Sequence, residues 1–185
     1  MGRGAQRRSG VGVQPMWGPL TRLGLVVAAI SAAIDQASKL WLLYVFDLPA
    51  RAPMRLTPFL DLVMTWNKGI SYGLFQQEGP FGQWVLLAIK VAAVALLMVW
   101  LARAGSWLTA VSLGLIIGGA AGNAIDRLVH DGVADFILFH ISTATIHFNW
   151  YVFNLADAAI VAGVAGLLYE SALGDRAAKV PRSPT

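Results

Sequence analysis

The chain has 185 residues, of which 57% are hydrophobic and 13% charged, and its mean hydropathy is +0.62. This composition excludes an intrinsically disordered chain and argues against an ordinary soluble domain. The formal net charge is +4, but half of the 14 basic residues lie in or next to the two tails, beside apolar runs, as membrane topology signals do. No nucleic-acid partner is therefore expected. The absence of Cys excludes a disulfide, a thiolate nucleophile and Cys-ligated zinc.

The first membrane-length apolar run covers residues 21–45, after a Gly-, Arg- and Pro-rich leader (residues 1–19) that we expect to be disordered. About 20 apolar residues suffice to cross a bilayer. The alternative is a cleavable signal peptide, with residues 3–22 as its basic region and 23–34 as its apolar region. Apolar character resumes at residues 40–46, which favours one long uncleaved helix.

The rest of the chain alternates polar segments with further apolar runs. Residues 46–82 are rich in Pro and Gly and contain a strand-like stretch at 60–66, which predicts a small extramembrane sheet. We predict further membrane spans at residues 83–102, 107–127 and 152–170. Residues 128–151 would form an outer loop with some helix or strand. One membrane domain would cover residues 20–172, followed by a polar tail at 173–185.

Four spans place both tails on one side, together with Arg103 in the loop between the second and third spans. The positive-inside rule assigns this side to the cytoplasm. Segments 46–82 and 128–151 then face outward. Small residues at Gly114, Gly118 and Gly122 follow i, i+4, i+8 spacing in the third span, which predicts close packing against another helix.

The polar residues at the outer ends of the last two spans are candidates for chemistry. Asn123, Asp126 and Arg127 share one patch of helix surface at i, i+3 and i+4. Asn154 and Asp157 would occupy the first turns of the fourth span, and the loop between carries a third Asp, at position 135. Topology therefore brings three Asp to one depth. Ionised Asp is costly near lipid and is usually functional there.

Two Asp in a partly dry site can share a proton and act as an acid/base pair that activates water against a peptide bond. Spacing does not decide which two form the pair. Asp135 lies between apolar neighbours, which would raise its pKa. The alternative for Asp126 and Arg127 is structural, as an ion pair and amide network that ties the span ends together.

Two other groups have both a structural and a functional interpretation. Asp35 and Lys39 are at i, i+4, either as a helix-end pair with Lys39 snorkelling or as support for the site. Asn67 and Gly69 lie in the outer segment, either in an ordinary loop or where Asn67 could clamp an extended peptide. An H-E-x-x-H pattern is absent, and we expect neither a metal nor a cofactor.

Five sequence blocks resemble, in order, the signatures of bacterial lipoprotein signal peptidase (signal peptidase II). They are Asp35-Gln-Ala-Ser-Lys39, Asn67-Lys-Gly-Ile-Ser-Tyr-Gly73, Gly119-Ala-Ala-Gly-Asn123-Ala-Ile-Asp126-Arg127, Val133-Ala-Asp135-Phe136 and Phe153-Asn154-Leu-Ala156-Asp157. The resemblance covers roughly residues 20–172. Only the stretch 140–151 looks longer than the family pattern.

The resemblance implies an aspartic endopeptidase of the bacterial inner membrane. It would cleave prolipoproteins just before a diacylglyceryl-modified Cys and be sensitive to globomycin. The expected fold is all-α, with four transmembrane helices, a small extracytoplasmic β-cradle and a short periplasmic helix or loop. The catalytic pair would be Asp135 and Asp157. The supporting or substrate-binding residues would be Asp35, Lys39, Asn67, Gly69, Asn123, Asp126, Arg127, Asn154 and Ala156. Prolipoproteins and membrane lipid would be its partners, and the chain would be a monomer.

Two hypotheses from other classes compete with a peptidase. A small transporter or proton channel could use the same Asp residues as a relay, although a relay needs sites across the whole membrane. A non-catalytic scaffold could bind lipidated peptides through segment 46–80 without turnover.

Overall fold

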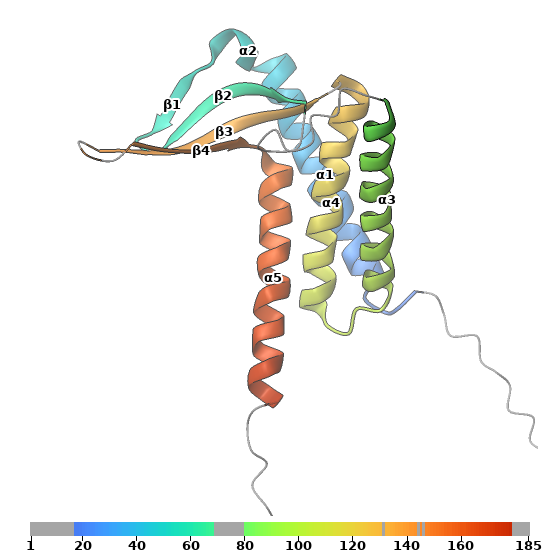
Figure 1. The fold of residues 1–185 in the computed structure, drawn as a ribbon. Helices are drawn as coiled ribbons and strands as arrows, with labels where there is room; N and C mark the ends of the chain where they lie inside the picture. The colour runs from blue at the N-terminus through green and yellow to red at the C-terminus, as the bar shows by residue number, and fades with distance from the viewer. Residues whose placement is uncertain (1–16, 69–79, 131, 144, 146, 179–185) are drawn as a thin grey trace, which may run out of the picture.

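The computed structural model describes residues 17–68, 80–130, 132–143, 145 and 147–178, and consists of a group of long helices with a sheet at one end (Figure 1). The long helices are α1 (Thr21–Leu40), which continues into a π-helical turn (η1, Trp41–Val45), α3 (Pro80–Ala102), α4 (Trp107–His130) and α5 (Leu155–Ala178). The start of α1 and the end of α5 both lie at the end of the helices opposite the sheet.

Within the described residues, three helical segments are long and apolar enough to cross a membrane. They are Thr21–Val45, Trp107–His130 and Leu155–Ala172, and Val91–Ala102 forms a shorter apolar helix. The predicted first and third spans agree with this result. The predicted start of the fourth span at residue 152 is wrong, because residues 147–153 pair in a strand and the helix begins only at Leu155.

The sheet has four antiparallel strands in the order β1-β2-β3-β4. It follows a short helix, α2 (Leu48–Arg51), and its strands are β1 (Met54–Thr57), β2 (Leu60–Asn67), β3 (Val133–Ser142) and β4 (His147–Phe153). The strand predicted at residues 60–66 is confirmed. Segments 46–82 and 128–151, which are far apart in sequence, therefore both contribute strands to one sheet.

The expected fold class is confirmed in part, since the described chain is mostly helical with a small antiparallel sheet. The short helix or loop expected in segment 128–151 is wrong, because this segment supplies strands to the sheet. No described residue between His130 and Leu155 is helical, and most of the stretch belongs to β3 and β4. Its apolar and aromatic residues, such as Phe136-Ile-Leu-Phe139 and Trp150-Tyr-Val-Phe153, favour strands. The long stretch 140–151 contains the end of β3 and most of β4.

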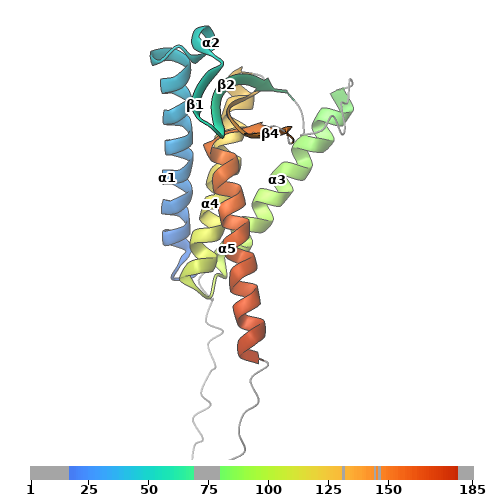
Figure 2. The same cartoon turned by 90° about the vertical axis from the view of Figure 1, so that its left-hand side faces the viewer.

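Helix α4 packs between α1 and α5, as the glycine pattern predicts. A Cβ on Gly114 would lie 2.5 Å from the carbonyl oxygen of Gly24, and one on Gly118 would lie 2.5 Å from that of Ala28. The backbones of α1 and α4 are therefore in direct contact. Helix α3 diverges from α4 toward the end where the sheet lies (Figure 2).

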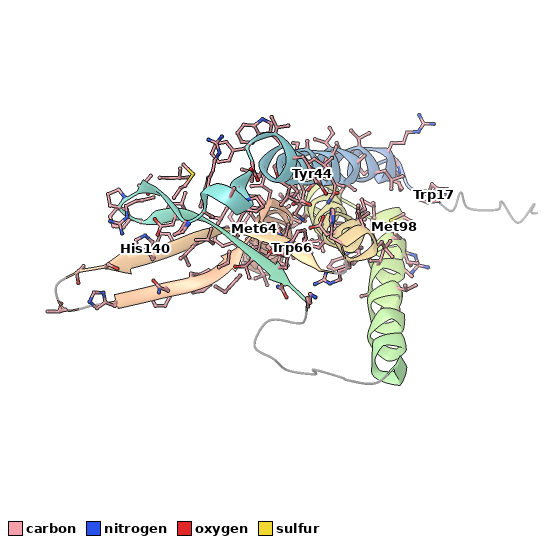
Figure 3. All side chains as sticks on the ribbon, turned by 90° about the horizontal axis from the view of Figure 1, so that it is seen from above. Trp17, Tyr44, Met64, Trp66, Met98 and His140 are labelled. Carbon is pink, nitrogen blue, oxygen red and sulfur yellow. The ribbon has the colours of Figure 1, made fainter. Side chains whose placement is uncertain are left out.

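An apolar cluster fastens the sheet to the helices. Leu42 of η1, Leu48 of α2 and Phe136 of β3 are buried together. Seen from above, Met64 and Trp66 of β2 lie near the helices while His140 lies farther out on the sheet (Figure 3). The start of β3 is consequently held against the ends of the helices, where the candidate residues gather.

Candidate active site

Strand pairing places Asp135 beside Asn67. In the β2–β3 register Thr65 is opposite Asp135 and Asn67 is opposite Val133. The Asn67 Nδ2 donates a hydrogen bond of 3.1 Å to Asp135 Oδ2. Asp135 is buried, with 2% of its surface exposed. The sheet therefore brings a carboxylate from one outer segment to an amide from the other.

A capping box holds Asp157 at the start of α5. The N–H of Asp157 donates to Asn154 Oδ1 over 3.0 Å, and the N–H of Asn154 donates to Asp157 Oδ2 over 3.3 Å. Asn154 is thus the N-cap rather than a first-turn residue as predicted. Asp157 lies in the first turn, where the partial positive charge of the helix end stabilises a carboxylate.

Two amides connect Asp135 with Asp157. The Asn154 Nδ2 donates to Asp135 Oδ1 over 2.6 Å and to Asn123 Oδ1 over 3.0 Å. In turn, the Asn123 Nδ2 donates to Asp157 Oδ1 over 2.9 Å. Asn154, Asn123 and the two carboxylates therefore form one hydrogen-bonded group, to which β3, α4 and α5 each contribute.

The environment of Asp135 favours its protonated form. Burial raises the pKa of Asp135 to about 6, and the nearby negative charge of Asp157 acts in the same direction. Hydrogen bonds from Asn67 and Asn154, and the positive charge of Lys39, oppose this rise, but desolvation is the larger effect. Asp135 can accordingly hold a proton at a pH at which ordinary carboxyl groups are ionised.

A buried cluster of charges lies behind the two amides. The Lys39 Nζ is 2.8 Å from Asp35 Oδ2 and 2.8 Å from Asp126 Oδ2, and it donates to Asn123 Oδ1 over 3.1 Å. Only 2% of the Lys39 side chain is exposed. The snorkelling alternative for Lys39 is therefore wrong, and its three donors each have an acceptor.

Asp126 does not pair with its neighbour Arg127. Its two oxygens instead contact Lys39 and the Gln36 Nε2, the latter over 2.8 Å. Arg127 is half-buried, and its Nη1 donates to the carbonyl oxygen of Asn123 over 3.1 Å. Within the described residues, Arg127 forms no ion pair. The structural role considered for Asp126 exists, but with a different cation.

The remaining predicted site residues have different outcomes. Ala156 is fully buried, and its N–H donates to Asp35 Oδ1 over 2.9 Å. Gly69 lies outside the described residues. Gln36 was missed as a site residue, although a polar side chain beside Asp35 in an apolar run was the available signal. Among the described residues, no three His, Asp or Glu side chains are grouped to hold a metal ion.

Comparisons with known proteins agree on one family. The family model described as signal peptidase (SPase) II matches residues 27–173. A lipoprotein signal peptidase of Nitrobacter hamburgensis is 58% identical over 160 residues, covering 86% of this chain and 98% of the relative. One of Rhodopseudomonas palustris (strain TIE-1) is 54% identical with the same coverage.

The fold is similar to that of a solved bacterial membrane enzyme, determined by the in meso method at 2.3 Å resolution. The TM-score is 0.64 at 22% identity, and the match covers 89% of this chain and 95% of the other.

Proposed function

The chain belongs to the signal peptidase II family, and on this premise we propose that it is an intramembrane aspartic endopeptidase. Its substrates are diacylglyceryl-modified prolipoproteins, which it cleaves just before the lipidated Cys. The observation that carries the aspartic mechanism is the group of two carboxylates, Asp135 and Asp157, joined through Asn154 and Asn123.

In this mechanism the two carboxyl groups share one proton, because like charges held close together do not both ionise easily. Asp135 is the neutral partner, in keeping with its raised pKa. Asp157 is the ionised partner, in keeping with its place at a helix N-terminus. Asp157 takes a proton from water as the water oxygen bonds to the peptide carbonyl carbon, and Asp135 donates its proton to the carbonyl oxygen. Collapse of the tetrahedral intermediate breaks the C–N bond, the proton on Asp157 passes to the leaving amine, and Asp135 recovers its proton from the intermediate.

The supporting residues are assigned by their contacts. Asn67, Asn123 and Asn154 orient the two carboxylates, while Asp35, Lys39 and Asp126 form the buried charge cluster behind them. Arg127 donates to the backbone carbonyl of Asn123, and the backbone N–H of Ala156 is held by Asp35. Gly69 completes the set on the strength of the sequence pattern alone. The reaction needs no metal or cofactor.

The proposed topology has four spans, with α3 as the additional one, and both termini in the cytoplasm. The first and last helix ends lie opposite the sheet, and Arg22 and Arg103 lie at that end, where the positive-inside rule expects cytoplasm. The sheet and the site then face the periplasmic leaflet of the inner membrane. One membrane domain covers residues 20–172, with a cytoplasmic leader at 1–19 and tail at 173–185, and it works as a monomer among lipids.

The position of the carboxylates along the helices disfavours the transporter hypothesis. Asp35, Asp126, Asp135 and Asp157 gather at the sheet end of the helices, whereas a proton relay requires carboxylates along the membrane path. The scaffold hypothesis differs from ours because it predicts that the protein binds lipidated peptides without cleaving them.

The decisive experiment is cleavage of a synthetic diacylglyceryl-Cys prolipopeptide by purified full-length protein in detergent. We compare the native chain with Asp135→Asn and Asp157→Asn. Asp61→Asn is the matched control, because Asp61 lies on β2 beside Arg55 and His140. We expect product from the native chain and the control only, and globomycin should suppress it. Product from either dyad variant would remove that residue from the mechanism, and a folded native protein without product would favour the other two hypotheses.

A further inference from the structure

The backbone just before each proposed catalytic Asp is bound by a buried carboxylate. Ala134 precedes Asp135, and its N–H donates to Asp126 Oδ2 over 3.1 Å. Ala156 precedes Asp157, and its N–H donates to a carboxylate of α1 over 2.9 Å. Both alanines are buried, with 2% and 0% of their surface exposed. Each N–H therefore needs an acceptor from the protein.

One ammonium group joins these two carboxylates. The Lys39 Nζ lies 2.8 Å from Asp35 Oδ2 and 2.8 Å from Asp126 Oδ2, and all three side chains are buried. The contacts run without interruption from Ala156 through Asp35, Lys39 and Asp126 to Ala134. The segments carrying the two proposed catalytic carboxylates, on α5 and β3, are thus connected through α1 and α4.

We propose that Lys39 is a positioning residue that fixes the separation of Asp135 and Asp157 by holding Asp35 and Asp126 together. The inference rests on the proposed function, since it concerns the geometry of that catalytic pair. The positioning acts mainly through the backbone N–H groups of Ala134 and Ala156, next to the two catalytic residues.

The chemistry of the link suits a fixed distance. Hydrogen bonds and ion pairs between charged groups are stronger and shorter than those between neutral groups. Two carboxylates this deep need a cation, because a buried charge without a partner is strongly destabilising. Lys39 offers three donors from one compact charge, and its third donor goes to Asn123, which itself contacts Asp157. Positioning errors of about 1 Å can lower turnover about 100-fold.

If Asp35 and Asp126 act together through Lys39, the effects of two substitutions on kcat do not add, whereas the effects of independent contacts would add. Asp35→Asn and Asp126→Asn each keep an oxygen for the alanine N–H but lose the charge that pairs with Lys39. Each should lower kcat about 10- to 100-fold, with KM nearly unchanged. The double variant Lys39→Met/Asp35→Asn removes one positive and one negative charge and so keeps the net charge of the cluster. It leaves Asp126 without its cation, and thermal unfolding measures that loss of stability separately from kcat. In a series connection that is already broken by Asp35→Asn, the second change lowers kcat no further.

The pH dependence of kcat/KM tests the proposal independently of folding, because a smaller amount of folded protein does not change the pH at which the rate falls. The charged groups that act on Asp135 are Asp157 of α5 and Lys39 of α1. Its amide donors are Asn67 of β2 and Asn154, the N-cap of α5. Asp126 of α4 accepts from the preceding backbone N–H. The charge of Lys39 lowers the pKa of Asp135. The alkaline limb of kcat/KM should therefore lie at higher pH in Lys39→Met/Asp35→Asn than in Asp35→Asn.

The measurements use full-length protein in detergent and the lipidated peptide, with folding checked by thermal unfolding. Arg22→Met is the matched control, because it removes an exposed cation from the opposite end of α1 and should leave kcat and the limb unchanged. The proposal is overturned if either single variant keeps native kcat, or if the double variant falls a further tenfold with an unmoved limb. Continued cleavage by Asp135→Asn or Asp157→Asn would instead overturn the proposed function.

Discussion

Asn154 combines two roles that substitution can separate. Its Oδ1 caps α5, and its Nδ2 donates to Asp135. Ser at this position keeps an oxygen for the cap but has no group that reaches Asp135, whereas Ala loses both interactions. The pair Asn154→Ser and Asn154→Ala therefore isolates the cap from the site.

The size of each effect follows from the contacts. A side-chain N-cap contributes about 1 kcal/mol, and a hydrogen bond to a charged group contributes about 1.5–3 kcal/mol. Asn154 is completely buried, so solvent does not replace these bonds. We expect Asn154→Ser to lower the free energy of unfolding by about 1.5–3 kcal/mol at pH 7.5. Asn154→Ala should lower it by about 1 kcal/mol more. For a chain of this size that further loss lowers Tm by roughly 2–4 °C.

The assays are thermal unfolding in detergent and cleavage of the lipidated peptide across pH. The Asn154 bond lowers the pKa of Asp135, so both variants should shift the alkaline limb of kcat/KM to higher pH by the same amount. Equal Tm values for the two variants would refute the capping role. A native pH profile in Asn154→Ser would refute the electrostatic role of the amide.

Three further predictions concern proton balance, helix packing and metal dependence. Because the pKa of Asp135 is about 6, kcat/KM should fall as pH rises through about 6 and the shared proton is lost. The corresponding fall in kcat should occur at higher pH, since bound substrate buries the site further. A flat profile from pH 5 to 8 would contradict this. Gly118→Ala should cost about 1–3 kcal/mol in thermal unfolding, because its Cβ meets the Ala28 carbonyl, whereas Gly105→Ala, with open space around it, should be within about 0.5 kcal/mol of native. Chelation with EDTA should leave the rate of peptide cleavage unchanged, and a loss restored by added metal would argue against an Asp pair acting alone.

Hydropathy predicted the long apolar helices at Thr21–Val45 and Trp107–His130 well, because a bilayer-length apolar run has few alternatives. The stretch 128–151 was harder, because β3 is stabilised by pairing with β2, more than 60 residues away along the chain, for example Trp66 with Ala134, and β4 in turn pairs with β3. Local sequence carries little information about such partners. The start of α5 was placed too early because residues 147–153 form β4, which pairs with β3.

Which residues form the candidate site could be predicted from the sequence, but the contacts between their side chains were harder to predict. Topology alone brought three Asp together, and the family resemblance chose Asp135 and Asp157. The ion-pair partner of Asp126 could not be read from adjacency, since Arg127 follows it directly while Lys39 lies 87 positions earlier in the sequence. That choice depends on the glycine face of α4, which lets α1 approach closely: a Cβ on Gly122 would lie 2.5 Å from Asp35 Oδ2.

The i, i+4 pair of Asp35 and Lys39 also bears on how the chain is made. Both partners lie on α1, 2.8 Å apart, so α1 carries its own counter-ion into lipid, where a lone charge costs several kcal/mol. We expect Lys39→Ala to reduce insertion of α1 in a translocation assay more than Lys39→Ala/Asp35→Ala does. Asp126 then arrives on α4 at a cation already in place, and Asp157 arrives last. The growing chain therefore has no complete form of the proposed catalytic pair until α5 has been made.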